Sequence, residues 1–218
     1  MDGLFALASH GRSSLPLDVL AGLSLLSIAP FVLVLSTSFV RIVVVLSLVR
    51  SAIGAATLPP NTVITGLALV LTFAIMTPTL ERVSHDAIEP YERGAITQQT
   101  MLMRAFAPVR GFMLRQTHVH DLALFAGMAR VPLASPADAP PAVLLPAFVV
   151  GELRSAFAIG FALYLPFVAI DLAVASILMG LGMFMLSPPI VSLPCKLLLF
   201  VMVDGWALVC GGIVSSFR

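Results

Sequence analysis

The chain has 218 residues, of which 59% are hydrophobic and only 11% are charged. A soluble domain carries about 25% charged residues, so the composition excludes an ordinary soluble protein and favours one helical membrane unit. Its net charge of +1 is too small for binding the phosphates of a nucleic acid. The two cysteines, Cys195 and Cys210, lie in apolar sequence and cannot build a disulfide framework or a zinc quartet.

The N-terminal part, residues 1–80, contains two long uncharged stretches. The first, Val19 to Val40, is long enough for a bilayer-spanning helix of roughly 20 residues, and we expect it to be retained rather than cleaved as a secretory signal. The second, Thr62 to Leu80, predicts another long helix that ends near Pro78. Between them Pro59 and Pro60 predict a hairpin turn, because proline disfavours the helical conformation of the residue before it.

The middle part, residues 81–145, is polar. Twelve of the 23 charged residues lie between Glu81 and Asp138, which indicates a section that faces water. Ile96 to Arg115 mixes apolar and cationic positions as an amphipathic helix does. A stiff, extended connector is predicted from a series of prolines, Pro132, Pro136, Pro140, Pro141 and Pro146.

The last part, residues 146–218, returns to apolar sequence and predicts two further long helices. Pro188, Pro189 and Pro194 place the turn between them at Ser187 to Pro194. The predicted fold is therefore all-α, with two helical hairpins of the integral-membrane type, about four long apolar helices in all, joined by a polar and partly helical insert.

Residues for catalysis or metal binding are not evident in this sequence. Asp171 and Asp204 lie on different predicted helices, so they do not form an acid–base dyad. His118, His120 and Asp121 lack a fourth metal ligand and are interpreted as part of a solvated loop. The sequence also lacks the glycine-rich phosphate loops and the serine-hydrolase motif. We expect a protein that is not an enzyme and that binds no metal or cofactor.

Five charges interrupt the apolar sequence of the last part: Glu152, Arg154, Asp171, Lys196 and Asp204. Four of them, Arg154, Asp171, Lys196 and Asp204, are the ones that we expect to be buried. A charge at the bilayer centre costs roughly 2.5 to 3.5 kcal/mol even on a lenient insertion scale, so each needs a partner or water. We expect Arg154 and Lys196 each to meet a carboxylate, from Asp171, from Asp204 or from a neighbouring copy. For Lys196 the alternative is that its side chain extends to the membrane surface beside the proline turn.

Two further patterns in this part point to packing or to a pore. Small residues follow one helix face, which allows another helix of the same chain or of a second subunit to approach closely; they are Ala169, Ala173, Ser176 and Gly180. The segment Met183, Phe184 and Met185 lies just before the turn prolines. Such flexible apolar side chains are either filler of a core or a deformable constriction that gates a pore by excluding water.

Three stretches together resemble the FliP/SctR family, the core export-gate proteins of bacterial flagella and of type III secretion injectisomes. The first is Thr37 to Leu80, with Ser38-Phe39-Val40-Arg41-Ile42 and Leu58-Pro59-Pro60-Asn61. The second is Gly151 to Met185, with Glu152-Leu153-Arg154-Ser155 and Leu165-Pro166-Phe167-Val168-Ala169-Ile170-Asp171. The third is Ser187 to Trp206, with Ser192-Leu193-Pro194-Cys195-Lys196 and Val203-Asp204-Gly205-Trp206.

The resemblance implies a subunit that works by assembly. Several copies, as a pentamer, would form a helical ring with a small two-helix subunit and one larger related subunit, in contact with membrane lipid. Unfolded secreted proteins would pass through the ring. In the family a run of methionines constricts the closed pore, and the matching positions are Met183, Phe184 and Met185. Phe184 departs from the methionine that is usual there and is stiffer.

The resemblance also implies a location in the bacterial inner membrane, with apolar helices that can sit partly above the bilayer plane. Six arginines between Glu81 and Asp138 would place the insert in the cytoplasm by a simple positive-inside count. The family places it on the periplasmic side, and we follow the family because the insert is near the length at which the rule weakens. The short sequence before the first apolar stretch favours the injectisome branch over the flagellar one.

A membrane permease is the alternative to an export-gate subunit. Its substrate site would lie at the midplane around Asp171, Lys196 and Asp204. Internal repeat symmetry would favour a permease, and we find none that is convincing between the two halves. The detergent-solubilised mass of the protein with its partners separates the two hypotheses, because a gate gives a large mixed complex and a permease a monomer or dimer.

Overall fold

The computed structural model describes residues 27, 30–54 and 58–217 of the chain, which divides into two units, residues 1–35 and 36–218. The first unit contains a helical segment at residues 30–35. The first part of the predicted helix from Val19 to Val40, residues 19–26 with 28 and 29, lies outside the described residues. Its predicted end is wrong, because the backbone leaves the helix at residues 36–38, where the Thr37 hydroxyl oxygen accepts a hydrogen bond from the Phe39 N–H at 3.3 Å.

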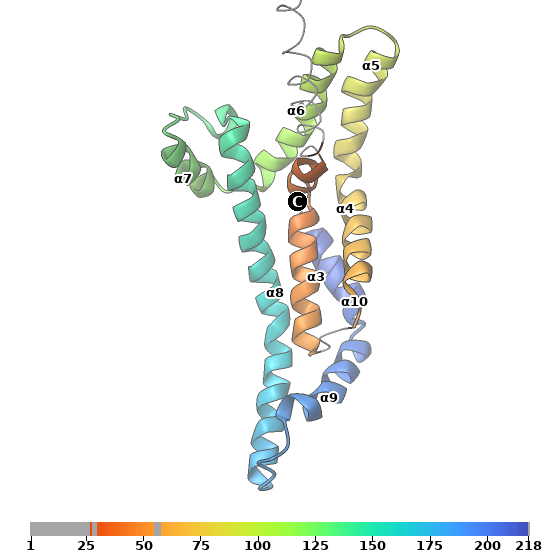
Figure 1. The fold of residues 1–218 in the computed structure, drawn as a ribbon, viewed down its shortest axis with the longest axis vertical. Helices are drawn as coiled ribbons and strands as arrows, with labels where there is room; N and C mark the ends of the chain where they lie inside the picture. Colours follow the sequence, from red (N-terminus) through yellow and green to blue (C-terminus); the bar gives the residue numbers. More distant parts are fainter. Residues whose placement is uncertain (1–26, 28–29, 55–57, 218) are drawn as a thin grey trace, which may run out of the picture. The chain divides into compact units, whose positions relative to one another are not determined.

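Every regular element described in the second unit is helical, which confirms the predicted all-α class (Figure 1). In chain order the elements are α3 (Phe39–Ile53), α4 (Asn61–Val83), the π-helical turn η1 (Ser84–Ile88), α5 (Glu89–Glu92), α6 (Gln98–Gln116), α7 (Val119–Ala129), the 3-10 turn η2 (Pro136–Asp138), α8 (Pro141–Gly180), α9 (Pro188–Met202) and α10 (Gly205–Ser215).

Helices α3 and α4 form a hairpin whose connection contains Pro59 and Pro60. Helix α3 ends at Gly54, whose φ of 84° is a left-handed conformation that glycine adopts without strain. The Arg50 guanidinium closes the connection, since its Nη1 donates to the Asn61 side-chain oxygen at 2.5 Å and to the Pro59 carbonyl at 3.3 Å. A side chain at the end of one helix therefore fixes the start of the next.

Helix α4 does not end near Pro78, as the sequence predicts. It contains that proline and continues through η1 and α5 as one helix of 32 residues, from Asn61 to Glu92. Proline removes one backbone hydrogen bond of a helix, and long apolar helices tolerate this loss when the surrounding residues continue the ladder. The insert therefore begins as an extension of an apolar helix.

The insert contains two more helices. The predicted amphipathic helix Ile96 to Arg115 is present as α6. The predicted solvated loop at His118 to Asp121 is wrong, because His118 caps α7 and the Asp121 side chain is fully buried. The predicted extended connector is shorter than expected, since α8 already begins at Pro141 and contains Pro146. Proline suits the first turn of a helix, where its missing N–H would have no helical partner.

Helix α8 has 40 residues and lies beside α3 (Figure 1). The two helices approach closely at Gly160, where a Cβ atom would lie 2.3 Å from Cδ1 of Leu48. The connection to α9 is Leu181 to Ser187, earlier than the predicted Ser187 to Pro194, because Pro188 and Pro189 form the first turn of α9. The last predicted helix is broken near Asp204, where α9 and α10 meet at a bend of 65°.

Two apolar clusters hold the second unit together. One joins α3, α4 and α8 to α9 and α10, around Ile42, Leu46 and Phe200. The other joins α6, α7 and the first half of α8, around Met113, Leu144 and Phe148. Among the described residues, the helices Asn61–Glu92 and Pro141–Gly180 are long and apolar enough to cross a membrane, and α9 with α10 makes a third if the bent pair is one span. Helix α3 has 15 residues, fewer than the roughly 20 that a span needs.

Candidate functional site

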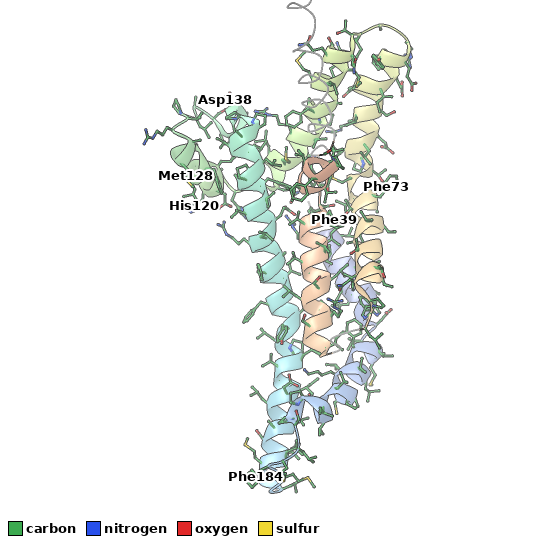
Figure 2. All side chains as sticks on the ribbon, in the orientation of Figure 1. Phe39, Phe73, His120, Met128, Asp138 and Phe184 are labelled. Atoms are coloured by element: carbon green, nitrogen blue, oxygen red, sulfur yellow. The ribbon has the colours of Figure 1, made fainter. Side chains whose placement is uncertain are left out.

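The connection between α8 and α9 presents an apolar tip at one end of the second unit. Figure 2 shows Phe184 at this tip, at the opposite end of the unit from Asp138 in the insert. The side chains of Met183, Phe184 and Met185 are 47%, 78% and 100% exposed, respectively. These side chains are therefore not packed in a core of the chain, and they are accessible to lipid, another subunit or a substrate.

The backbone of the tip has a defined conformation. The Met183 N–H donates to the Leu178 carbonyl at 2.9 Å, and the Gly182 N–H donates to the Met179 carbonyl at 3.1 Å. These two bonds form a Schellman motif, in which the residue after the helix end is left-handed, and Gly182 has a φ of +75°. The glycine thus ends α8 without strain and directs the three following side chains outward.

The stripe of small residues on α8 is exposed. Ala169, Ala173, Ser176 and Gly180 are all on the surface of the chain. Nothing lies within 4 Å of a Cβ atom placed on Gly180. The sequence leaves two alternatives open for this stripe, packing within the chain or against a second subunit. In the described part of the chain the stripe is not used for packing, so this face is available to a second chain.

Lys196 and Asp171 form an ion pair that joins α9 to the second half of α8. Lys196 is 5% exposed, and its Nζ donates to Oδ2 of Asp171 at 2.6 Å and to the carbonyl of Ala52 at 3.2 Å. The second carboxylate oxygen of Asp171 accepts a bond from the Ser192 hydroxyl at 2.5 Å. Lys196 therefore points inward, where its charge has partners, and does not extend to a membrane surface.

The sequence predicts that Arg154 pairs with Asp171, with Asp204 or with a carboxylate of a neighbouring copy. Within this chain it pairs with neither Asp171 nor Asp204. It donates two hydrogen bonds to Asp121 on α7, at 2.7 and 2.9 Å, and its own side chain is 51% exposed. Gly151 lies on the same face, where a Cβ atom would be 3.6 Å from Asp121 Oδ2. Because α7 is a helix rather than a solvated loop, it brings a buried carboxylate to Arg154 from within the insert.

Asp204 is exposed and makes no ion pair with another described residue. It lies in the bend between α9 and α10, with φ 50° and ψ 55°, a left-handed conformation that aspartate tolerates better than most side chains. Its expected burial is not found in the single chain, because the helix break carries it to the surface. No group of three metal-ligating side chains is present in the described part of the chain.

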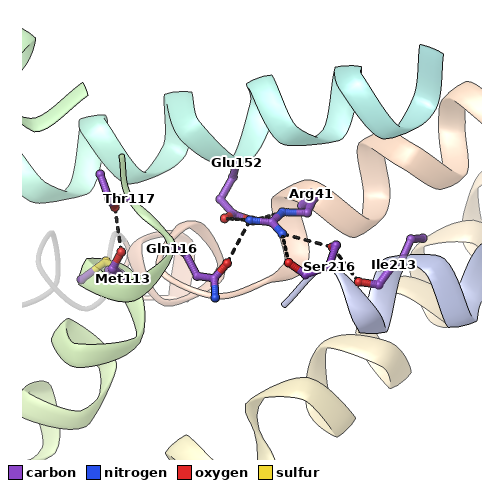
Figure 3. A network of polar contacts seen from close by, with 7 residues as sticks. All are labelled: Arg41, Met113, Gln116, Thr117, Glu152, Ile213 and Ser216. Carbon is purple, nitrogen blue, oxygen red and sulfur yellow. Dashed lines mark hydrogen bonds and ion pairs between the residues drawn. The ribbon is translucent and has the colours of Figure 1, made fainter. Parts of the chain in front are cut away.

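A buried ion pair between Arg41 and Glu152 is the feature that sequence reasoning missed (Figure 3). The guanidinium donates from Nε to Oε2 of Glu152 at 2.9 Å and from Nη2 to Oε1 at 2.5 Å. The side chains of the two residues are 4% and 0% exposed. The sequence carries a signal for this pair, because Arg41 follows a long uncharged stretch and Glu152 lies in the apolar last part, but it does not indicate that the two side chains are partners.

The remaining donors of Arg41 extend this pair into a network across four segments. Nη1 donates to the carbonyl and the hydroxyl of Ser216, at 3.0 and 3.1 Å, and Nη2 donates to the Gln116 side-chain oxygen at 3.2 Å (Figure 3). All five guanidinium N–H groups thus have an acceptor. The ring of Phe217 also lies 3.9 Å from the guanidinium carbon. Arg41 therefore links α3, the end of α6, α8 and the segment after α10.

Comparison with known proteins decides the family. The FliP family model matches residues 22–213. The flagellar biosynthetic protein FliP of Caulobacter vibrioides is 50% identical over 202 residues, which cover 90% of this chain and 74% of that protein. FliP of Pectobacterium carotovorum is 49% identical over 213 residues (97% and 83%), and FliP of Bacillus subtilis is 42% identical over 215 residues (98% and 97%).

The chain belongs to the FliP family. The resemblance to FliP/SctR that the sequence motifs carry is thereby confirmed. These FliP relatives are flagellar proteins by name, so the comparisons do not support the preference for the injectisome branch. The apolar tip and the ion pair of Arg41 with Glu152 lie within the matched residues, whereas Ser216 and Phe217 of the Arg41 network lie just after them.

A double-mutant cycle tests whether the ion pair of α8 and α9 acts as a unit. We expect Lys196→Met and Asp171→Asn each to lower the yield of assembled complex more than the double change does, with a coupling of about 1 to 3 kcal/mol. The control cycle uses Arg93 and Glu89, an exposed pair at 2.8 Å, for which we expect about 0.3 to 0.5 kcal/mol. Additive effects at Lys196 and Asp171 would show that the two charges act independently.

Proposed function

We propose that the chain is a pore-forming subunit of a type III export gate, which conducts unfolded proteins across the bacterial inner membrane and carries out no catalysis of its own. Family membership and the names of its FliP relatives support a role in a flagellar export apparatus. The single observation that supports the pore-forming role is the apolar tip, Met183 to Met185, whose side chains are exposed in the single chain.

The chemistry of the tip suits a seal. No charged residue lies between Asp171 and Lys196, so the whole connection can exclude water and ions. A strongly exposed apolar patch needs an apolar partner, and copies arranged around one axis would supply it to one another. Methionine side chains are unbranched and flexible, so they can close on one another or around a passing chain without leaving polar groups unpaired.

The surface of the same hairpin suits assembly. Ala169, Ala173, Ser176 and Gly180 form an exposed face of small residues, and close backbone approach is how helices associate in membranes. The proposed assembly is a pentamer of this chain, completed by a small two-helix subunit and a larger related subunit. Unfolded secreted proteins are the proposed substrates.

The insert is proposed to lie on the periplasmic side and to contact its copies around the ring. Its section from Glu81 to Asp138 carries six arginines and six acidic residues. Such a balance of charges allows complementary contacts between identical neighbours. It stands at the end of the unit opposite to Phe184, so the seal would lie toward the cytoplasmic side of the gate.

The mass of the solubilised complex tests the proposed function. The chain is expressed with the genes of its candidate partners and purified in mild detergent, and the mass is measured by light scattering that is corrected for detergent. We expect one large mixed complex with several copies of this chain. A monomer or dimer that binds none of the partners would support a permease instead.

Thiol labelling tests the proposed orientation. Cys195 and Cys210 are first replaced, and Met103, which is 63% exposed on α6, is then changed to cysteine. In intact cells with a permeabilised outer membrane, a membrane-impermeant thiol reagent should label this variant and leave the cysteine-free parent unlabelled. Labelling only after lysis of the inner membrane would mean that the orientation is inverted.

A further inference from the structure

The second half of α8, the tip and α9 form one hairpin, Phe167 to Met202, that is tied more strongly within itself than to the rest of the chain. Within the hairpin, Asp171 bonds to both Lys196 and Ser192. Of the buried residues of α8, only Phe167 and Leu178 follow Pro166. The first half of α8, by contrast, is anchored by the Glu152 and Arg154 ion pairs.

The hairpin joins the remaining structure at Pro166, inside the continuous helix α8, and at the bend between α9 and α10. On the α8 side, Pro166 lies inside the helix, has no N–H to donate and so leaves one carbonyl of the preceding turn without its helical partner. On the other side, Asp204 is left-handed between α9 and α10, which meet at a bend of 65°. Hinges are often residues at element ends, as at Asp204, where a few dihedral angles can absorb a rotation, and helices bend most readily at a proline, as at Pro166.

Pro166 and the bend at Asp204 border the same apolar cavity. The cavity has a volume of about 250 Å³, and its lining includes Pro166 and Phe167 from α8 and Val203 and Gly205 from the bend. Val49 of α3 lines it from the anchored part of the unit. The cavity is partly open to the surface, so it leaves room at both sites where a rotation would need it.

We propose that the hairpin Phe167 to Met202 moves as a lever about Pro166 and Asp204, into and out of this cavity, and that this movement opens and closes the seal at Met183 to Met185. The proposal rests on the proposed pore function and adds what moves the seal. The lever is about 21 Å long, at 1.5 Å per helical residue, so a rotation of about 10° displaces the tip by about 4 Å.

A hydrogen bond from Lys196 Nζ to the carbonyl of Ala52, at 3.2 Å, joins the lever to the anchored part of the unit near the end of α3. The pair of Lys196 with Asp171 stays within the lever and is kept during the movement. Lys196 thus acts as a positioning residue that holds the lever in the closed state through its bond to Ala52.

Two substitutions that hinder the hinge by different means test the lever. Pro166→Ala restores the backbone donor and stiffens α8, and its control is Pro146→Ala in the same helix, away from the cavity. Leu163→Phe fills the cavity that Leu163 lines, and its control is Leu172→Phe, at a residue that is 65% exposed. Each variant is expressed with its partners in cells that lack their own copy. The yield of the complex and the rate of substrate export are measured for each variant. In a second set, Met183, Phe184 and Met185 are also changed to alanine in each variant, and the conductance of the complex is measured.

We expect both test variants to assemble as the parent does and to export about three- to tenfold more slowly, because each adds an interaction that bending must break. Both controls should export at the parent's rate. If both test variants export at the parent's rate, the lever proposal is wrong. It is also wrong if both test variants fail to assemble while the controls assemble, since these sites would then be needed for packing and not for movement. If changing Met183 to Met185 to alanine raises the conductance in none of the variants or the parent, the proposed pore function is wrong. That result is distinct from a failure of the lever proposal.

Discussion

Replacing Met183, Phe184 and Met185 together by alanine should leave a gate that assembles normally but leaks ions and small metabolites. The three side chains are exposed in the single chain, and substitution at such positions changes the free energy of unfolding by about 0.5 kcal/mol or less. The turn is kept, because Gly182 and the bonds of the Schellman motif are unchanged. Only the apolar bulk that would exclude water from the closed pore is removed.

The leak is measured as the conductance of the purified complex in planar bilayers and as slowed growth of cells that express it. We expect a conductance several-fold above that of the parent. The matched control changes three exposed apolar residues of the same hairpin outside the tip, Leu172, Ile177 and Leu198, to alanine. A complex of the tip variant that assembles and conducts no more than the parent would falsify the seal.

The second large effect is expected at Arg41. Arg41→Lys keeps the positive charge but should lower the free energy of unfolding by about 3 kcal/mol or more, because a lysine cannot replace five donors in a planar fork. Glu152→Gln should cost a similar amount, since it leaves a buried guanidinium without its counter-charge. Denaturant unfolding in detergent, followed by tryptophan fluorescence, measures both.

Arg50→Lys is the matched control for Arg41→Lys. It lies in the same helix but bonds to Pro59 of the connection and to Asn61 at the start of α4, in a more exposed place, so we expect a loss of about 1 kcal/mol or less. The double change Arg41→Met with Glu152→Met should recover most of the stability that either single change loses, because it buries no unpaired charge. If Arg41→Lys unfolds at the parent's denaturant concentration, the network is not a major source of stability.

The sequence predicts the helical class because this class depends on local patterns. Long uncharged stretches indicate apolar helices, and prolines indicate their ends. The same proline rule misplaces three boundaries, at Pro78, Pro146 and Pro194, since one missing hydrogen bond does not end a helix whose other residues continue the ladder. The break at residues 36–38 is missed for the opposite reason, because hydropathy does not register hydroxyl groups that compete for backbone donors.

The partners of the isolated charges could be predicted only where they lie on neighbouring helices of one hairpin. Lys196 and Asp171 are 25 residues apart and face each other across a turn. Arg154 instead takes Asp121 from the insert, and Arg41 takes Glu152 from 111 residues away. Hydropathy indicates that such a charge needs a partner but carries no information on which distant helix supplies it.

The Arg41 network has a consequence for the biogenesis of the chain. The bond from Arg41 to Ser216 spans 175 residues. Because ribosomes add about 5 to 20 residues per second, Ser216 is synthesised on the order of 10 to 35 seconds after Arg41. During that time an apolar helix carries a charge whose acceptors have not all been synthesised. The second unit therefore reaches its final packing only after translation is almost complete, and until then Arg41 must stay in contact with water, lipid headgroups or an insertion factor.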